Sequence, residues 1–174
     1  MRMASVEADG ELVGRAAELA RERFAARADR YDREASFPAE DFADLFRAGL
    51  LGAGVPRTHG GHGLGPDTGL FTLWMITKEL AKADMALARC WEGHVNSQML
   101  LTALGDARQQ DRWFRGIVEH GEIWAAWSGE PQSRIPGQTA RFGTNVREAR
   151  GGYVVDGTKV FATSARGARW AICS

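Results

Sequence analysis

The stretch DMALARCWEGHVNSQMLLTAL, residues 84–104, decides the fold of the amino-terminal part of the chain. Its apolar residues recur at helical spacing and its charges are few, which is typical of a helix enclosed by other helices. Arg89, Glu92 and His94 interrupt the run. It is therefore too polar for a transmembrane helix, which needs about 18 or more apolar residues. We predict that this helix is the most buried element of a helical bundle.

Amphipathic helices are predicted on both sides of this stretch. The first runs from Leu12 through Tyr31, and the second begins around Pro38, a residue suited to a first helical turn. A loop rich in glycine and proline follows over residues 52–67. Downstream, Asp106 and Gln109 have the spacing of a capping box and begin a fifth helix. The third helix, between the loop and residue 84, is expected to carry its apolar side on Leu70, Phe71, Trp74, Thr77 and Ala81.

After Gly121 the apolar period changes from that of a helix to that of a strand. The predicted strands begin near Glu122 and include residues 140–146, 153–155, 158–163 and 170–173, with turns at Arg150-Gly151-Gly152 and Asp156-Gly157. The expected fold class is α+β. An α-helical bundle over residues 1–121 precedes the beginning of an antiparallel β-barrel-like domain over residues 122–174. Since an isolated hairpin is marginal in water, we expect this β domain to be truncated.

Composition excludes several functional classes. The chain of 174 residues has 22 basic and 22 acidic side chains, so its formal net charge is zero. A nucleic-acid partner would require a surplus of basic residues. Cys90 and Cys173 lack CxxC or metal-ligand spacing, as expected of reduced thiols in a cytoplasmic protein. The amino terminus lacks the apolar core of a signal peptide, and we expect no membrane partner.

The sequence lacks the common motifs of phosphate binding, serine catalysis and metal binding. The glycine-rich segment 60–65 lacks the Gly-Lys-Ser/Thr ending of a phosphate-binding loop, and Ser128 does not lie in a GxSxG elbow. His59 and His62 show no carboxylate at ligand spacing, so no metal site is expected. His94 lies on the predicted buried helix, where two interpretations stay open: a hydrogen-bonded core histidine or a functional group.

The order of these parts resembles the acyl-CoA dehydrogenase family. Glu130-Pro131 stands where that family has a Thr-Glu-Pro segment at the opening of its β domain. Gly157-Thr158-Lys159 and Phe161-Ala162-Thr163 resemble the turn of Asn-Gly-x-Lys type that leads into a Trp-Ile-Thr strand. Residues 50–63 resemble the family's loop between the second and third helices, and residues 83–88 resemble the start of its long fourth helix. Together these motifs cover nearly the whole chain.

The resemblance implies FAD as the cofactor. Ser128 and Gly129 would lie beside the pyrimidine side of the flavin, Phe161 against the isoalloxazine ring, and the Thr163 hydroxyl would point at flavin N5. The family's Gly-Ser-Asp segment is absent here, and Ser133 is the candidate substrate contact in its place. The full set of residues implied to bind the cofactor is Trp127, Ser128, Gly129, Phe161, Ala162 and Thr163.

The leading hypothesis is an FAD-dependent oxidoreductase acting on CH–CH groups. In the family's chemistry a carboxylate removes the α-proton of an acyl-CoA thioester, and the β-hydride passes to flavin N5. The glutamate base belongs to a carboxy-terminal helical domain, so no catalytic residue is expected in this chain, which alone would be inactive. The resemblance also implies a cytoplasmic homo-oligomer, a dimer or tetramer, when full length.

Two alternatives remain. The first is a monooxygenase of the same fold that uses reduced flavin; the missing Gly-Ser-Asp favours it, and His94, Ser128 and Ser164 would then be the residues of interest. The second is a non-catalytic helical interaction module, if the natural chain ends at Ser174.

Overall fold

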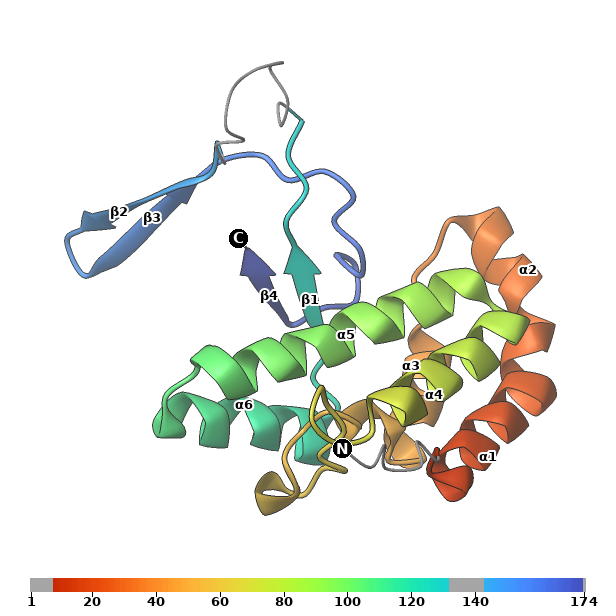
Figure 1. Ribbon diagram of the computed structural model, residues 1–174. Helices are drawn as coiled ribbons and strands as arrows, with labels where there is room; N and C mark the ends of the chain where they lie inside the picture. The colour runs from red at the N-terminus through yellow and green to blue at the C-terminus, as the bar shows by residue number, and fades with distance from the viewer. Residues whose placement is uncertain (1–7, 132–142, 174) are drawn as a thin grey trace, which may run out of the picture.

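The computed structural model describes residues 8–131 and 143–173, and it divides into a helical region and a strand region (Figure 1). The chain opens with one long helical rod. It consists of α1 (Gly10–Leu19), a π-helical turn (Ala20–Phe24) and α2 (Ala25–Glu34). The Asp9 side chain caps the rod by accepting the amides of Glu11 and Leu12. This confirms the predicted first helix.

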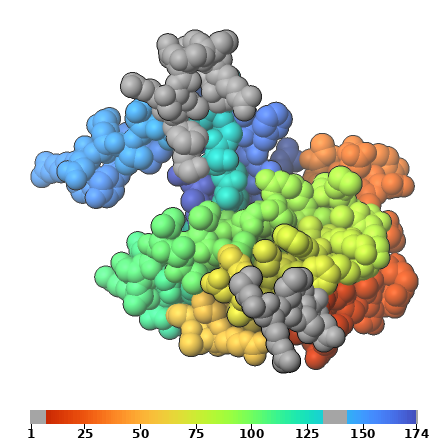
Figure 2. Space-filling model, in the orientation of Figure 1, coloured from red at the N-terminus to blue at the C-terminus, as the bar shows by residue number. Residues whose placement is uncertain are grey.

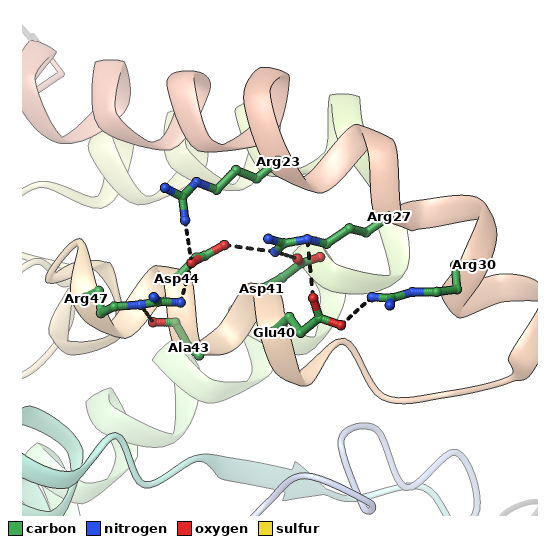
Figure 3. A network of polar contacts seen from close by, with 8 residues as sticks. All are labelled: Arg23, Arg27, Arg30, Glu40, Asp41, Ala43, Asp44 and Arg47. Atoms are coloured by element: carbon green, nitrogen blue, oxygen red, sulfur yellow. Dashed lines mark hydrogen bonds and ion pairs between the residues drawn. The ribbon is translucent and has the colours of Figure 1, made fainter.

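A second helix, α3 (Ala39–Arg47), lies against this rod and is tied to it by ion pairs (Figure 3). Arg27 donates to Asp41 at 2.6 Å and to Asp44 at 2.8 Å, and both carboxylates are almost fully buried. Burial is the main influence on Asp41 and raises its pKa to about 6 despite the Arg27 contact. Arg23 also donates to Asp44 at 2.9 Å, so buried charges are compensated from the neighbouring rod.

The centre of the bundle is an antiparallel pair of helices, α4 (Leu70–Ala83) and α5 (Met85–Leu104), with α6 (Ala107–His120) following. Asp84 separates the pair and caps α5, while Asp106 and Gln109 form the predicted capping box of α6. The helix α5 contributes more buried residues than any other described helix or strand, which confirms the prediction that it is the most buried element of the bundle. They are Leu87, Ala88, Trp91, Gly93, His94, Val95, Ser97, Gln98 and Leu101.

The apolar residues predicted for α4 are core residues only in part, since Leu70 and Ala81 pack against the core. Trp74 is 62% exposed and Phe71 is also exposed, whereas the buried residues are Thr72, Leu73, Ile76 and Leu80. The helix is apolar on two sides, so spacing alone could not show which side packs on α5. The contact with α1 and α5 selects the side with Leu73 and Ile76.

The strands form two separate pairs. The hairpin of β2 (Asn145–Ala149) and β3 (Gly152–Asp156) is antiparallel, as predicted, and turns at Gly151 with a φ of 85°. The other pair, β1 (Trp124–Trp127) and β4 (Trp170–Cys173), runs parallel, which differs from the antiparallel arrangement expected. Figure 2 shows the hairpin projecting away from the helical body.

The predicted strand over residues 158–163 is also wrong, because this segment forms an irregular loop. Phe161 has a φ of 55° and Ser164 a φ of 65°, values that no regular strand contains. The alternating residues 140 and 142 of another predicted strand lie outside the described residues. No helix among the described residues is long and apolar enough to cross a membrane.

Candidate functional site at the junction of helices and strands

Two segments that the sequence marks as cofactor-binding lie side by side. The Val160 amide donates to the Gly129 carbonyl at 2.9 Å, and the Trp127 indole N–H donates to the Thr163 carbonyl at 3.0 Å. A Cβ atom at Gly129 would lie 3.1 Å from the Val160 carbonyl oxygen, so glycine permits this close approach. The fold therefore brings residues 127–129 and 160–163 into one wall, the junction wall.

The side chains of the junction wall are unevenly exposed. The Phe161 ring is 92% exposed at a turn with positive φ, and the Ser128 side chain is exposed as well. Ala162 is half-buried. The Thr163 hydroxyl donates to the Phe161 carbonyl at 3.3 Å, so in this structure it lies within its own turn. The junction wall presents an aromatic ring to the outside and keeps most of its polar groups hydrogen-bonded within the protein.

Glu130 anchors the junction wall to the hairpin. Its carboxylate accepts hydrogen bonds from the Lys159 ammonium at 2.6 Å and from the Thr144 hydroxyl at 2.6 Å, as well as from the Thr144 and Gly143 amides. The Lys159 hydrogen bond is the largest influence and, with those of Thr144 and Gly143, lowers the pKa of Glu130 to about 2. Opposite charges in the Glu130-Pro131 and Gly157-Thr158-Lys159 motifs were the signal for this ion pair, which sequence analysis missed.

His94 is a fully buried hydrogen-bonded residue. Its Nδ1 accepts the Trp124 amide at 2.9 Å, so the ring proton is on Nε2, which donates to the Leu51 carbonyl at 3.0 Å. The Gln98 amide group also donates to that carbonyl, at 2.7 Å, and its oxygen accepts the Gly54 amide at 2.8 Å. Burial lowers the pKa of His94 to about 4, so the imidazole is neutral near pH 7. His94 thus joins α5 to the 50–54 segment and to the first residue of β1.

The loop after the junction wall rests on the helical region. Ser164 is buried and contacts Cys90 of α5, whose pKa is raised mainly by burial. Arg166 donates to the Ala35 carbonyl at 3.3 Å, and a side chain at Gly167 would overlap the ring of Phe37. Contacts between residues far apart in sequence therefore hold the segment 164–167.

The remaining candidates lie elsewhere. Ser133 falls outside the described residues. A cavity of about 870 Å³ lies beside the glycine-rich loop, with His62, Leu64 and Thr72 in its lining, and it does not include the junction wall. His62 contacts the Gly49 carbonyl at 3.1 Å, whereas His59 lies 3.0 Å from Asp111. The two histidines therefore have separate partners.

The sequence of residues 7–121 matches the model of the acyl-CoA dehydrogenase N-terminal domain, and the chain belongs to the acyl-CoA dehydrogenase family. Dibenzothiophene monooxygenase of Rhodococcus qingshengii is 29% identical over 161 residues, which cover 92% of this chain and 36% of that protein. Benzylmalonyl-CoA dehydrogenase of Aromatoleum aromaticum is 31% identical over 149 residues, which cover 83% of this chain and 37% of that protein. The chain thus spans little more than a third of these relatives.

The fold also occurs in a solved structure. TdsC of Paenibacillus sp. A11-2, crystallised with FMN and indole, superimposes with a TM-score of 0.77 at 23% identity. The superposition covers 95% of this chain and 40% of TdsC. At this identity the likeness concerns the fold: a helical amino-terminal domain followed by the start of a β domain.

Proposed function

We propose that this chain forms the amino-terminal part of a flavin-dependent oxidoreductase and that the junction wall is one side of its flavin site. The observation that carries the proposal is that residues 127–129 are hydrogen-bonded to residues 160–163. The Phe161 ring of the second segment stays exposed in this arrangement. A planar isoalloxazine ring is complementary to an exposed aromatic face. The exposed Ser128 hydroxyl supplies a polar group at the edge of that face.

The residues of this chain would bind and orient the ring. Phe161 and the half-buried Ala162 offer apolar contact, and the hydrogen bonds from Trp127 to Thr163 and from Val160 to Gly129 hold that surface in place. When bound, a flavin supplies two-electron chemistry, either hydride transfer or, once reduced, reaction with oxygen. The family resemblance supports FAD, and the FMN bound to TdsC supports the flavin class.

Within this class, the proposed reaction is oxygenation of a small organic molecule. One oxygen atom would enter the substrate, the other would leave as water, and a reduced flavin would provide the two electrons. The dibenzothiophene monooxygenase match supports this proposal because it extends over 92% of the chain. The sequence after Glu130-Pro131 supports it too, since Gln132-Ser133-Arg134 replaces the Gly-Ser-Asp of the CoA-dependent enzymes. In this proposal His94 is a packing residue, and the hydrogen bonds of both ring nitrogens to the backbone support that role.

Dehydrogenation of an acyl-CoA is the second candidate. The 31% identity to benzylmalonyl-CoA dehydrogenase over 83% of the chain favours it. The two candidates share the junction wall and differ in what the rest of the protein must supply.

The complete gene product can separate the two reactions. Oxygenation predicts that the protein, with reduced FMN or FAD and air, adds one oxygen atom to indole or dibenzothiophene, as measured by mass spectrometry. Dehydrogenation predicts that butyryl-CoA or benzylmalonyl-CoA bleaches the bound flavin without oxygen. Bleaching by an acyl-CoA together with no oxygenated product would overturn the first proposal in favour of the second.

The flavin site itself is tested by two matched aromatic substitutions. In the complete gene product, Phe161→Ala should weaken flavin binding about tenfold or more, since it removes the stacking face. Tyr153→Ala removes another exposed aromatic ring, on the hairpin, and should leave binding unchanged. Equal effects of the two substitutions would show that the junction wall does not hold the flavin. Residues 1–174 alone supply one wall, so we expect them to lose flavin during gel filtration.

A further inference from the structure

A second cavity, distinct from the junction wall, lies between α6 and the start of β4. Its volume is about 410 Å³, which is within the range of small-ligand sites. Basic side chains dominate its rim. The basic residues among its lining are three arginines of α6, His120 and Arg169, and the Trp170 ring lies beside them.

The arginines of this cavity converge from two elements. Arg108, Arg112 and Arg115 follow one another at helical spacing on α6, so they share one side of that helix, and Arg169 precedes β4. The lining therefore combines four guanidinium groups with two carboxylates, those of Asp111 and Glu122. Because the whole chain has a net charge of zero, this excess of positive charge is a local feature.

Both carboxylates already have partners, and those of Glu122 belong to the cavity itself. Asp111 lies 3.0 Å from the His59 ring, and Glu122 accepts the Trp170 indole N–H at 2.7 Å while standing 4.0 Å from Arg169. Arg115 has its own partner, Glu119, at 3.9 Å. Charge neutralisation within the cavity is thus incomplete.

Arg108 and Arg112 carry the uncompensated charge. Within residues 8–131 and 143–173, neither forms an ion pair, and Arg112 instead lies over the Trp170 ring at 5.3 Å. Arg108 also stands in the first turn of α6, where the helix dipole disfavours a cation. An anion bound between these side chains would pair with both guanidinium groups and would also offset the repulsion between Arg108 and the helix dipole.

We propose that this cavity binds the phosphate or diphosphate group of a small metabolite. The planar guanidinium fork matches phosphate oxygens two at a time, and adjacent forks on one helix side can share a diphosphate. The cavity is larger than a single oxyanion requires, so an organic part of the ligand can remain attached. This site does not depend on flavin chemistry.

Calorimetric titration of the 174-residue chain with inorganic pyrophosphate tests the site. We expect saturable binding of one pyrophosphate per chain that persists at about 0.15 M salt, where loose surface attraction is largely screened. Arg108→Gln/Arg112→Gln should weaken it about tenfold or more, since two charge-assisted contacts are lost. Both side chains are exposed, so circular dichroism should show an unchanged fold.

The matched control is Arg33→Gln/Arg150→Gln, which removes the same charge from two exposed positions outside the cavity. It should bind pyrophosphate like the unaltered chain. Equal weakening by both double variants would mean that only net charge matters, and it would overturn the site. Absence of saturable binding at about 0.15 M salt would overturn it too. Equally tight binding of malonate would reject the phosphate class, and ADP binding at least as tightly as pyrophosphate would support a phosphorylated metabolite.

Discussion

The helical region and the hairpin of the strand region are held in place by different kinds of contact. In the helical region one continuous apolar core joins the helices, and its buried polar groups are mostly paired with partners from other elements. In the strand region every residue of β2 is exposed, and Val146, Tyr153 and Val155 of the hairpin present apolar surface to solvent. The helices draw stability from packing, whereas the hairpin is positioned by a small number of polar contacts.

The two regions also use charge differently. In the helical region, the buried carboxylates of Asp41 and Asp44 pair with Arg27 (Figure 3). Loss of the Arg27 cation would leave negative charges in a poorly solvated place. The Glu130–Lys159 pair is also shielded, with side chains 7% and 9% exposed, but it joins segments that lie outside the continuous apolar core. Substitutions in the first region should therefore change the global free energy of unfolding, and those in the second should change local order. The following predictions test this contrast.

The largest effect is expected at Trp91, the central aromatic residue of α5. Its side chain is 1% exposed, and its indole N–H donates to the Leu50 carbonyl at 3.1 Å. Trp91→Ala should lower the free energy of unfolding by about 3–5 kcal/mol, because it leaves a large cavity. Trp74→Ala, at a position 62% exposed, is the matched control and should cost less than about 1 kcal/mol. Similar losses for both in urea titrations would contradict the described packing of α5.

A somewhat smaller effect is expected at Arg27. Arg27→Gln removes the cation that faces two buried carboxylates and should destabilise the protein by about 3 kcal/mol. Arg30→Gln breaks a more exposed ion pair with Glu40, and it should cost less than about 1 kcal/mol. Urea titrations near pH 7 measure both. If Arg30→Gln proved as costly as Arg27→Gln, burial of Asp41 and Asp44 would not be what makes the network important.

The next effect concerns pH, and two buried groups should act in opposite directions. The pKa of His94 is about 4 in the folded chain and lies near 6.5 when unfolded. Between pH 4 and 6.5 the unfolded chain therefore binds more protons than the folded chain does. The contribution of His94 to stability is lost as pH falls from about 6.5 to 4. The folded pKa of Asp41, about 6, is raised, so its contribution is present at low pH and is lost as pH rises toward 6.

Variants of these two residues separate the opposing slopes. Between pH 6.5 and 5, stability of the unaltered chain should fall relative to His94→Gln by about 1.5 kcal/mol, since a full proton difference corresponds to about 1.4 kcal/mol per pH unit and the unfolded histidine is only half protonated at pH 6.5. Over the same range, Asp41→Asn should lose more stability on acidification than the unaltered chain does. Thermal or urea unfolding at several pH values gives both slopes. A His94→Gln curve parallel to that of the unaltered chain would exclude a buried neutral imidazole.

The comparison of regions also explains what could be predicted from sequence. Period and capping signals located the helices, because Asp106 and Gln109 act within one turn. They could not choose the buried side of α4, where Trp74 and Ile76 are both apolar and only contact with α1 and α5 distinguishes them. Residues 158–163 have strand-forming composition, yet Phe161 adopts a positive φ.

Contacts distant in sequence limited the prediction of the site as well. Motif order indicated residues 127–129 and 161–163, and the structure places these segments together. Nothing local to His94 indicates that its partners are Leu51 and Trp124, since these contacts depend on the packing of three elements. The parallel pairing of β1 with β4 depends in the same way on the intervening loop.

The smallest global effect is expected at Glu130, where the strand region should respond locally. Glu130→Gln keeps the size of the side chain but removes the charge that accepts hydrogen bonds from Lys159, Thr144 and Gly143. The helical core does not include these residues, so the midpoint of urea unfolding should stay the same. Amide hydrogen exchange at Thr144 should become about tenfold faster, because its hydrogen bond weakens and the segment opens more often. Glu148→Gln makes the same chemical change on the exposed strand β2 and should leave that exchange unaltered.

If Glu130→Gln lowered the unfolding midpoint as Arg27→Gln does, the anchor would belong to the global core. Unchanged exchange at Thr144 would instead show that the hairpin is positioned without Glu130, and the contrast between a packed region and a tethered region would fail.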